Sequence, residues 1–350
     1  MTRAGAIARG VLHSWPMETG PSVDIASRSS AESLPFHRLA RNEAFRWWRP
    51  VAAALLAVGT AVLAVIVLTF AALAAGSFTT LPRTAGGFGL GAAGDTGVTL
   101  VMIAALIPAV LFWTRVIGRR PAGTVSSVTG RLRWSWLGTC LLVAIAAVVL
   151  MLIGMQVMMS ATGGSVISGK AHFPGRAAFL ATLAMLVVLV PLQAAGEEYL
   201  FRGLALQTLG AFLRNPAIPI VVQALLFAAA HGWGTPWGFA ALTVSGLVAG
   251  VLAIRTGGIE SYIGFHVANN LIAFTLAAAA GQLANESTAA DMPWQMTIVS
   301  VVVDVAYALV ILVLARRRGL AVTASPAPVT PPIADPWQPI PVPASSPDIA

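Results

Sequence analysis

The sequence predicts an all-α, polytopic integral membrane protein with about eight transmembrane helices. Of its 350 residues, 57% are hydrophobic and only 10% are charged, and its mean hydropathy is +0.82. A soluble domain normally has about 25% charged residues, so this chain has too few to cover a water-soluble globule of its size. Several uninterrupted apolar runs also reach about 20 residues, the length at which a helix spans the hydrocarbon core of a bilayer. Both observations predict a lipid bilayer as the partner of this chain.

Apolar runs separated by short polar connections give the expected helices in chain order. We expect membrane helices over residues 51–75, 97–117, 136–159, 177–202 and beyond, 217–232, 237–255, 259–280 and 295–315. A polar, cytoplasmic N-terminal segment, residues 1–49, precedes the transmembrane helical domain, residues 50–317. The tail that follows, residues 318–350, is rich in proline and is expected to be extended and disordered.

The 21 basic residues, all arginine except Lys170, indicate how the helices are oriented. Most of them lie in alternate connections beside the apolar runs, which is the pattern of the positive-inside rule. A nucleic-acid-binding surface would gather them on one face instead, so we expect no nucleic-acid partner. Lys170 and Arg176 lie in a connection of the opposite kind and are the exceptions. We therefore expect a multi-pass protein of the inner (plasma) membrane with both termini in the cytoplasm.

Ionisable side chains inside the apolar runs cluster in one part of the chain. A charged side chain at the bilayer centre costs about 2.5–3.5 kcal/mol, so each one is a candidate functional residue. Asp304 stands apart, and we expect it to be a structural partner for another polar group. The remaining acids and histidines, with the arginine that follows the acidic pair, are Glu197, Glu198, Arg202, His231 and His266.

Helical spacing predicts which of these side chains share a face. Glu198 and Arg202 are four residues apart, so they can form a salt bridge. Glu197 is rotated by about 100° from Glu198 and lacks that partner. His266 and Asn270 are also four residues apart, so an imidazole and a carboxamide lie on one face of their helix.

The turn expected at residues 214–216 places side chains of the two helices that it joins at a common level. Glu198 lies 17 residues before Asn215, and His231 lies 16 residues after it. In an antiparallel hairpin, these equal distances place the two side chains at nearly the same height. His266 lies about 10 Å along the seventh helix, at 1.5 Å per residue. We therefore expect a polar cluster between helices four, five and seven that faces the cytoplasm from below the membrane surface.

A carboxylate, two histidines and an asparagine at one buried level can hydrolyse an amide bond. Glu197, its basicity raised by partial desolvation, would be the general base that activates water. A histidine would orient that water, and His266 and Asn270 could donate hydrogen bonds to the developing oxyanion. In an alternative version, Glu197, His231 and His266 bind Zn²⁺ with an open position for water. The H-E-x-x-H spacing of soluble zinc proteases does not occur in the sequence.

Three motifs in this part of the chain resemble those of a known family. "EEYLFR" (197–202) fits E-E-x-x-x-R, "FAAAH" (227–231) fits F-x-x-x-H, and "HVANN" (266–270) fits H-x-x-x-N. In this order and on separate helices, they are similar to the motifs of the CPBP family of intramembrane proteases. That family includes the type II CAAX prenyl endopeptidases and bacterial proteins linked to bacteriocin self-immunity. The resemblance covers about residues 177–280.

The resemblance implies a role for each motif residue. It makes Glu197 the residue that activates water, and Glu198 and Arg202 complete the first motif. It makes His231 the residue that holds the water, and it gives His266 and Asn270 the oxyanion-stabilising role. The family is described both as metal-dependent and as metal-free, and we favour the metal-free version. The strong preference for arginine over lysine, with abundant alanine and glycine, is typical of a GC-rich bacterial genome. The implied substrate is a membrane peptide or protein, which we expect to be unprenylated because bacteria generally lack prenylation.

A non-proteolytic function is the alternative. A membrane binding protein or a bacteriocin-immunity protein could keep the same polar cluster for structural reasons. A small transporter is a further alternative, but a transporter would show two related halves with broken helices. The sequence has no such halves.

Overall fold

The structure is a computed structural model that describes residues 33–81, 86–164, 171–284 and 288–324. The first 32 residues of the expected N-terminal segment and the proline-rich tail from residue 325 lie outside these ranges. The described chain is helical except for its connections and two strands of two residues each, β1 (Leu34–Pro35) and β2 (Thr323–Ala324).

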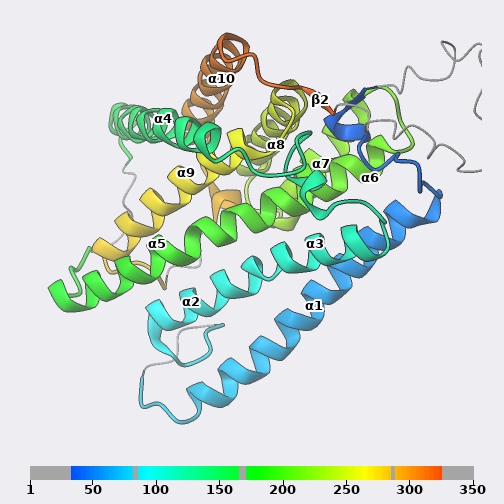
Figure 1. The fold of residues 1–350 in the computed structure, drawn as a ribbon. Helices are drawn as coiled ribbons and strands as arrows, with labels where there is room; N and C mark the ends of the chain where they lie inside the picture. Colours follow the sequence, from blue (N-terminus) through cyan, green and yellow to red (C-terminus); the bar gives the residue numbers. More distant parts are fainter. Residues whose placement is uncertain (1–32, 82–85, 165–170, 285–287, 325–350) are drawn as a thin grey trace, which may run out of the picture. The chain divides into compact units, whose positions relative to one another are not determined.

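Eight helical segments follow the eight expected apolar runs (Figure 1). They are α1 (Trp48–Gly76), α2 (Gly91–Ala104) with α3 (Leu106–Val116), α4 (Trp134–Ala161), α5 (Arg176–Glu198) with the π-helix η4 (Tyr199–Ala205) and α6 (Leu206–Gly210), α7 (Ala217–Ala230), α8 (Pro236–Thr256), α9 (Glu260–Ala279) and α10 (Trp294–Arg317). The short 3₁₀ turns are η2 (Phe36–Arg38), η3 (Ala122–Val125) and η5 (Ala289–Asp291). In the described part of the chain, seven segments are long and apolar enough to cross a membrane. The protein is therefore an all-α, multi-pass membrane protein.

The fifth expected helix is shorter than the sequence predicts. α7 has 14 residues, a length of about 21 Å, and so it falls short of a hydrocarbon core of about 30 Å. It ends because Gly232 takes a φ of 96°, a conformation that a helix cannot contain. The expected helix over 217–232 is therefore present to within two residues at its end, and the chain continues through non-helical residues to α8.

Contacts between helix ends fall into two sets, because successive helices run in opposite directions. At one end, the backbone N–H of Val128, between α3 and α4, donates to the carbonyl of Gly257, between α8 and α9, at 2.8 Å. At the other, the N–H of His172, before α5, donates to the carbonyl of Ala280, after α9, at 2.9 Å. We call the first the arginine-rich end, because the helix ends and connections there carry Arg41, Arg46, Arg49, Arg115, Arg119, Arg120, Arg131, Arg133, Arg214 and Arg255.

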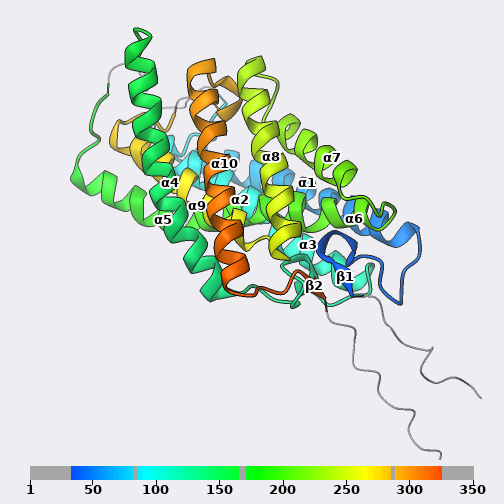
Figure 2. The same cartoon turned by 90° about the horizontal axis from the view of Figure 1, so that it is seen from above.

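The start and the finish of the described chain meet at the arginine-rich end. β1 pairs antiparallel with β2, with Leu34 opposite Ala324 and Pro35 opposite Thr323 (Figure 2). The chain must cross from one end of the helix bundle to the other an even number of times for its first and last described residues to meet. The short helix α7 and the residues that follow it therefore count as one of these crossings.

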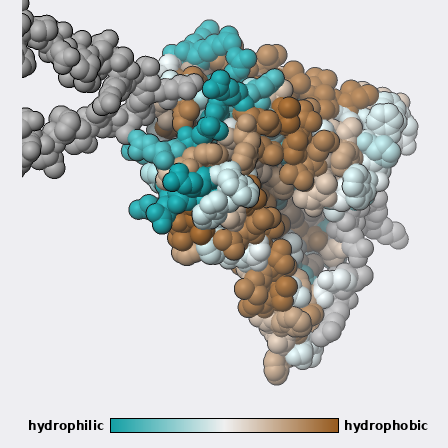
Figure 3. All heavy atoms as spheres, turned by 90° about the vertical axis from the view of Figure 1, so that its right-hand side faces the viewer, coloured by the Kyte–Doolittle hydropathy of each residue, from teal (hydrophilic) through white to brown (hydrophobic). Residues whose placement is uncertain are grey.

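Apolar side chains are widely exposed along the helices, as expected for a protein surrounded by lipid. Leu55 and Phe70 of α1 are 68% and 69% exposed, and Leu142 of α4 is 72% exposed. On the face drawn in Figure 3, hydrophilic side chains gather in one area and hydrophobic ones cover most of the rest. Exposed tryptophans lie near helix ends, at Trp47, Trp48, Trp134, Trp233, Trp237 and Trp294. Tryptophans in these positions are typical of the belts at the two membrane surfaces.

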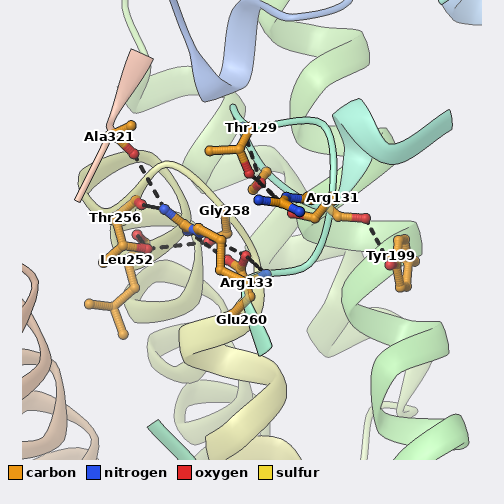
Figure 4. Close-up of polar contacts among 11 residues, drawn as sticks. Thr129, Arg131, Arg133, Tyr199, Leu252, Thr256, Gly258, Glu260 and Ala321 are labelled. Carbon is orange, nitrogen blue, oxygen red and sulfur yellow. Dashed lines mark hydrogen bonds and ion pairs between the residues drawn. The ribbon is translucent and has the colours of Figure 1, made fainter. Parts of the chain in front are cut away.

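A buried ion pair fixes the loop between α3 and α4 to the start of α9 (Figure 4). Arg133 Nε and Nη2 donate to the two carboxylate oxygens of Glu260 at 2.8 and 2.7 Å. Arg133 Nη1 also donates to the carbonyl of Thr256 at 2.9 Å. Because Glu260 is fully buried, its charge depends on this two-point contact for compensation.

We expect Glu260→Gln to lower the free energy of unfolding by about 3 kcal/mol, because it leaves the arginine without its charged partner. Thermal unfolding of the purified protein in detergent measures the loss. Arg131→Gln is the control, since it removes an exposed arginine from the same loop. Equal melting temperatures for the two variants would show that the ion pair does not hold the loop in place.

Candidate active site

All six predicted site residues lie in the described part of the chain, where α5, α7 and α9 approach one another. Glu197 and Glu198 are the last two residues of α5, and Arg202 belongs to η4. His231 directly follows α7. His266 and Asn270 lie on α9.

The two carboxylate oxygens of Glu197 have different surroundings. Gln193 Nε2 donates to Oε1 at 2.5 Å, and Gln193 Oε1 accepts from Asn270 Nδ2 at 3.1 Å. Oε2 is buried and accepts no hydrogen bond from the described residues. It faces Nε2 of His231 at 3.8 Å and Nε2 of His266 at 3.9 Å. One oxygen is therefore held in place, and the other is directed at two imidazoles.

Both imidazoles are oriented through their Nδ1 atoms. Nδ1 of His231 lies 2.9 Å from the backbone carbonyl of Phe227. Because a carbonyl only accepts, this Nδ1 carries a proton. Nδ1 of His266 lies 3.0 Å from Oε1 of Glu198 and donates to it in the same way. These contacts leave the Nε2 atoms of both rings directed at Glu197.

The predicted ion pair between Glu198 and Arg202 is present. Arg202 Nη1 lies 3.1 Å from Glu198 Oε1, and both side chains are fully buried. The guanidinium also lies over the rings of Phe227 and Tyr262, at 4.1 and 5.3 Å from their centroids. A buried cation gains from such aromatic faces as well as from its carboxylate partner.

The π-helix η4 directly follows the acidic pair and is tied to the loop that Glu260 anchors. π-helical turns are rare and occur often at functional sites. The hydroxyl groups of Tyr199, in η4, and Ser126, in that loop, lie 2.8 Å apart (Figure 4). A Cβ on Gly203 would lie 2.9 Å from the carbonyl oxygen of Val125. The loop therefore packs closely against the turn that carries Arg202.

A close backbone approach also positions the other side of α5. A Cβ on Gly196 would lie only 2.7 Å from the carbonyl oxygen of Ile103, in α2. Gly196 therefore permits α5 to lie against α2 at the residue that precedes Glu197.

We expect Gly196→Ala to destabilise the protein by about 1–3 kcal/mol, because backbone must move to admit the methyl group. Cleavage activity should fall as well, since Glu197 would shift with the helix. Thermal unfolding and peptide cleavage measure the two effects. Gly59→Ala, on α1, is the control, because its Cβ meets no atom within 4 Å. If both variants match the wild type, the close approach does not position the carboxylate.

Asp304 has the polar partner that the sequence predicts. Ser245 Oγ donates to Asp304 Oδ2 at 2.6 Å, and the Tyr262 hydroxyl lies 2.5 Å from the same Ser245 oxygen. Because the ring of Tyr262 lies beside Arg202, this contact reaches the edge of the site.

Gln193 was not predicted, because it is not ionisable. The signal for it is a polar side chain one helical turn before Glu197, within an otherwise apolar run. Its amide donates to the carboxylate and accepts from Asn270. Asn270 thus reaches Glu197 through Gln193 rather than by direct contact.

The geometry gives no support to the zinc alternative. Among the residues that the structure describes, no group of three or more His, Cys, Asp and Glu side chains is arranged to hold a metal ion. This includes the trio that the alternative requires, Glu197, His231 and His266.

Comparison with known proteins identifies the segment that holds this site. Residues 178–272 match the family model described as type II CAAX prenyl endopeptidase Rce1-like. This segment is similar to the Rce1-like family. The match confirms the resemblance seen in the three motifs, and the Rce1-like segment contains all six predicted site residues.

One curated relative shares more of the chain than the Rce1-like segment alone. The uncharacterized protein YyaK of Bacillus subtilis (strain 168) is 29% identical to this chain over 171 residues. The match covers 47% of this chain and 55% of the relative, so it spans about half the length of each. No solved structure gives a significant match.

Proposed function

We propose that the protein is an intramembrane endopeptidase that hydrolyses a peptide bond of a membrane-associated substrate with water activated by Glu197. One observation carries the proposal: Oε2 of Glu197 faces Nε2 of His231 and His266 at 3.8 and 3.9 Å. These separations are too long for direct hydrogen bonds and suit a water molecule that donates to Oε2 of Glu197 and to Nε2 of one imidazole. The Rce1-like segment supports the same activity, because its description names endopeptidases.

In the first step, Glu197 takes a proton from this water while the oxygen attacks the carbonyl carbon of the substrate. Gln193 keeps Oε1 occupied, so that Oε2 is the oxygen that receives the proton. His231, fixed by the carbonyl of Phe227, holds the water in the attacking position. The product of this step is a tetrahedral intermediate with a negatively charged oxygen.

The second step requires donors for that oxygen and a proton for the leaving amine. His266 can donate from Nε2 when that atom carries a proton, because its Nδ1 already donates to the carboxylate of Glu198. Asn270 has a second N–H that can reach the same oxygen, as the sequence motif predicts. Glu197 then returns its proton to the nitrogen of the breaking C–N bond. The products are a new carboxylate and a new amine.

A metal-free mechanism predicts that cleavage continues in the presence of a zinc chelator. We expect activity in detergent with 1,10-phenanthroline to match that in its non-chelating isomer, 1,7-phenanthroline, because the proton leaves water through a carboxylate. Loss of activity that added Zn²⁺ restores would contradict this mechanism in favour of the zinc alternative.

We further propose that the arginine-rich end faces the cytoplasm of the inner (plasma) membrane, together with both termini. The positive-inside rule supports this orientation, and the pairing of β1 with β2 supports placing both ends of the described chain on the same side. His266 lies six residues after Glu260, the start of α9, or about 9 Å from the arginine-rich end. A membrane peptide or protein, not necessarily prenylated, could then reach the site from the cytoplasmic half of the bilayer.

Complementation of a null strain tests the proposed function without knowledge of the substrate. We expect wild-type protein to restore the phenotype and Glu197→Gln to fail at equal abundance in the membrane. Full rescue by Glu197→Gln would instead support a non-proteolytic binding, immunity or transport function, in which the cluster is structural.

A further inference from the structure

A small cavity at the arginine-rich end has a polar lining that the proposed reaction does not use. Its volume is about 10 Å³, and it lies between the start of α1, the end of α3 and the segment formed by η4 and α6. The polar side chains that line it are Arg49, Thr114, Arg120 and Thr208. No acidic side chain is among the described residues that line it.

Arg120 is a buried cation without a charged partner. It is only 4% exposed, and its Nη1 donates to Gln207 Oε1 and to Thr124 Oγ1, which are both neutral. Burial lowers the pKa of Arg120 to about 9, which leaves the guanidinium charged at neutral pH. Within the described ranges, it forms no ion pair with a carboxylate. A buried charge in this state is costly unless an anion approaches it.

Two further groups on the cavity wall favour an anion with oxygen atoms. Arg49 also lines the cavity and adds a second positive charge, and its Nη1 donates to the backbone carbonyl of Ala44, which is neutral. The hydroxyl of Thr114 is fully buried and has no hydrogen-bond partner in the part of the chain described here. A ligand oxygen in the cavity would accept from this hydroxyl and from the guanidinium groups together.

Exposed tryptophans indicate that the cavity lies near the membrane surface, where phospholipid phosphates are found. Trp47 and Trp48, which directly precede Arg49, are 71% and 44% exposed, and exposed tryptophans beside a membrane helix mark the membrane surface. A volume of this size admits about one water-sized atom. A phosphate group would therefore place one oxygen inside the cavity and leave the rest of the headgroup at the surface.

We propose that Arg49, Thr114 and Arg120 bind the phosphate group of an anionic phospholipid in the leaflet at the arginine-rich end. The arginines supply charge-assisted hydrogen bonds, and the threonine hydroxyl donates to the oxygen inside the cavity. This site is separate from the six residues of the candidate active site, and it does not depend on the proposed proteolysis.

Native mass spectrometry of the full-length protein, delipidated in detergent, tests this proposal with two added lipids. We expect phosphatidylglycerol to bind more tightly than phosphatidylcholine. Arg120→Gln should weaken phosphatidylglycerol binding about tenfold, the loss expected for one charge-assisted hydrogen bond. Thr114→Val should also weaken it, without lowering the melting temperature of the lipid-free protein, because the hydroxyl has no partner in the protein to lose.

Arg115→Gln is the matched control, because it removes the same charge from an exposed position at the same end. If it weakens binding as much as Arg120→Gln does, surface charge alone attracts the lipid and the site is overturned. Unchanged lipid preference in both Arg120→Gln and Thr114→Val would overturn it as well. Inorganic phosphate is tested as a third ligand. If phosphate alone stabilises the protein and this effect requires Arg120, the cavity binds a soluble phosphate compound instead of a lipid.

Discussion

Glu197→Gln is expected to lower kcat for peptide cleavage by about 10²–10⁴-fold, the contribution of a positioned general base. The amide cannot take a proton from water, yet it has nearly the same shape as the carboxylate and keeps an oxygen that Gln193 can donate to. Stability should therefore stay close to that of the wild type. Cleavage of a membrane peptide in proteoliposomes and thermal unfolding in detergent measure the two quantities.

Glu43→Gln is the matched control for this variant, because Glu43 is an exposed carboxylate outside the site. It should leave both cleavage and melting temperature unchanged. A Glu197→Gln protein that folds and cleaves at the wild-type rate would remove Glu197 from the mechanism. The water would then need another base.

Arg202→Met is expected to lower the free energy of unfolding by about 3–5 kcal/mol, the usual cost of removing one partner from a buried ion pair. The side chain of Glu198 is fully buried and lies 3.1 Å from the guanidinium, so its charge would lose its main compensation. The variant also loses the contact of the guanidinium with the ring of Phe227. Thermal unfolding of the purified protein, or its titration with a denaturing detergent, measures this loss in the free energy of unfolding.

A double-mutant cycle separates the charge pair from general packing. We expect Glu198→Gln with Arg202→Met to be more stable than Arg202→Met alone, because no uncompensated charge remains. The double variant should still be inactive, since His266 would face an amide instead of a carboxylate. Additive losses in the cycle would mean that the pair does not hold this part of the fold together.

The sequence predicts the helices well, because each follows from an apolar run of membrane-spanning length. At α7 the predicted end, residue 232, lies two residues beyond the observed one. The helix includes Ala228 to Ala230 and ends there, because the positive φ of Gly232 does not fit a helix. Hydropathy measures how apolar a run is and does not detect a local backbone turn that brings a histidine into a site.

The candidate site was predicted through its ionisable residues, and the contacts between them only in part. Equal distances from Asn215 place His231 at the height of the acidic pair, but spacing along the chain does not give rotation. In the structure, His231 faces Glu197, whereas Glu198 contacts His266. The role of Glu260 could not be predicted either, because its partner lies 127 residues away in the sequence.

The measurement that tests the central claim most directly is a search for new C-termini in membranes of a null strain. Purified protein in proteoliposomes is fused with these membranes in water enriched in heavy oxygen, and terminal peptides are identified by mass spectrometry. We predict new C-terminal carboxylates that carry heavy oxygen with the wild type and none with Glu197→Gln. The same new termini from both proteins, or no new termini from the wild type, would contradict hydrolysis by water activated at Glu197.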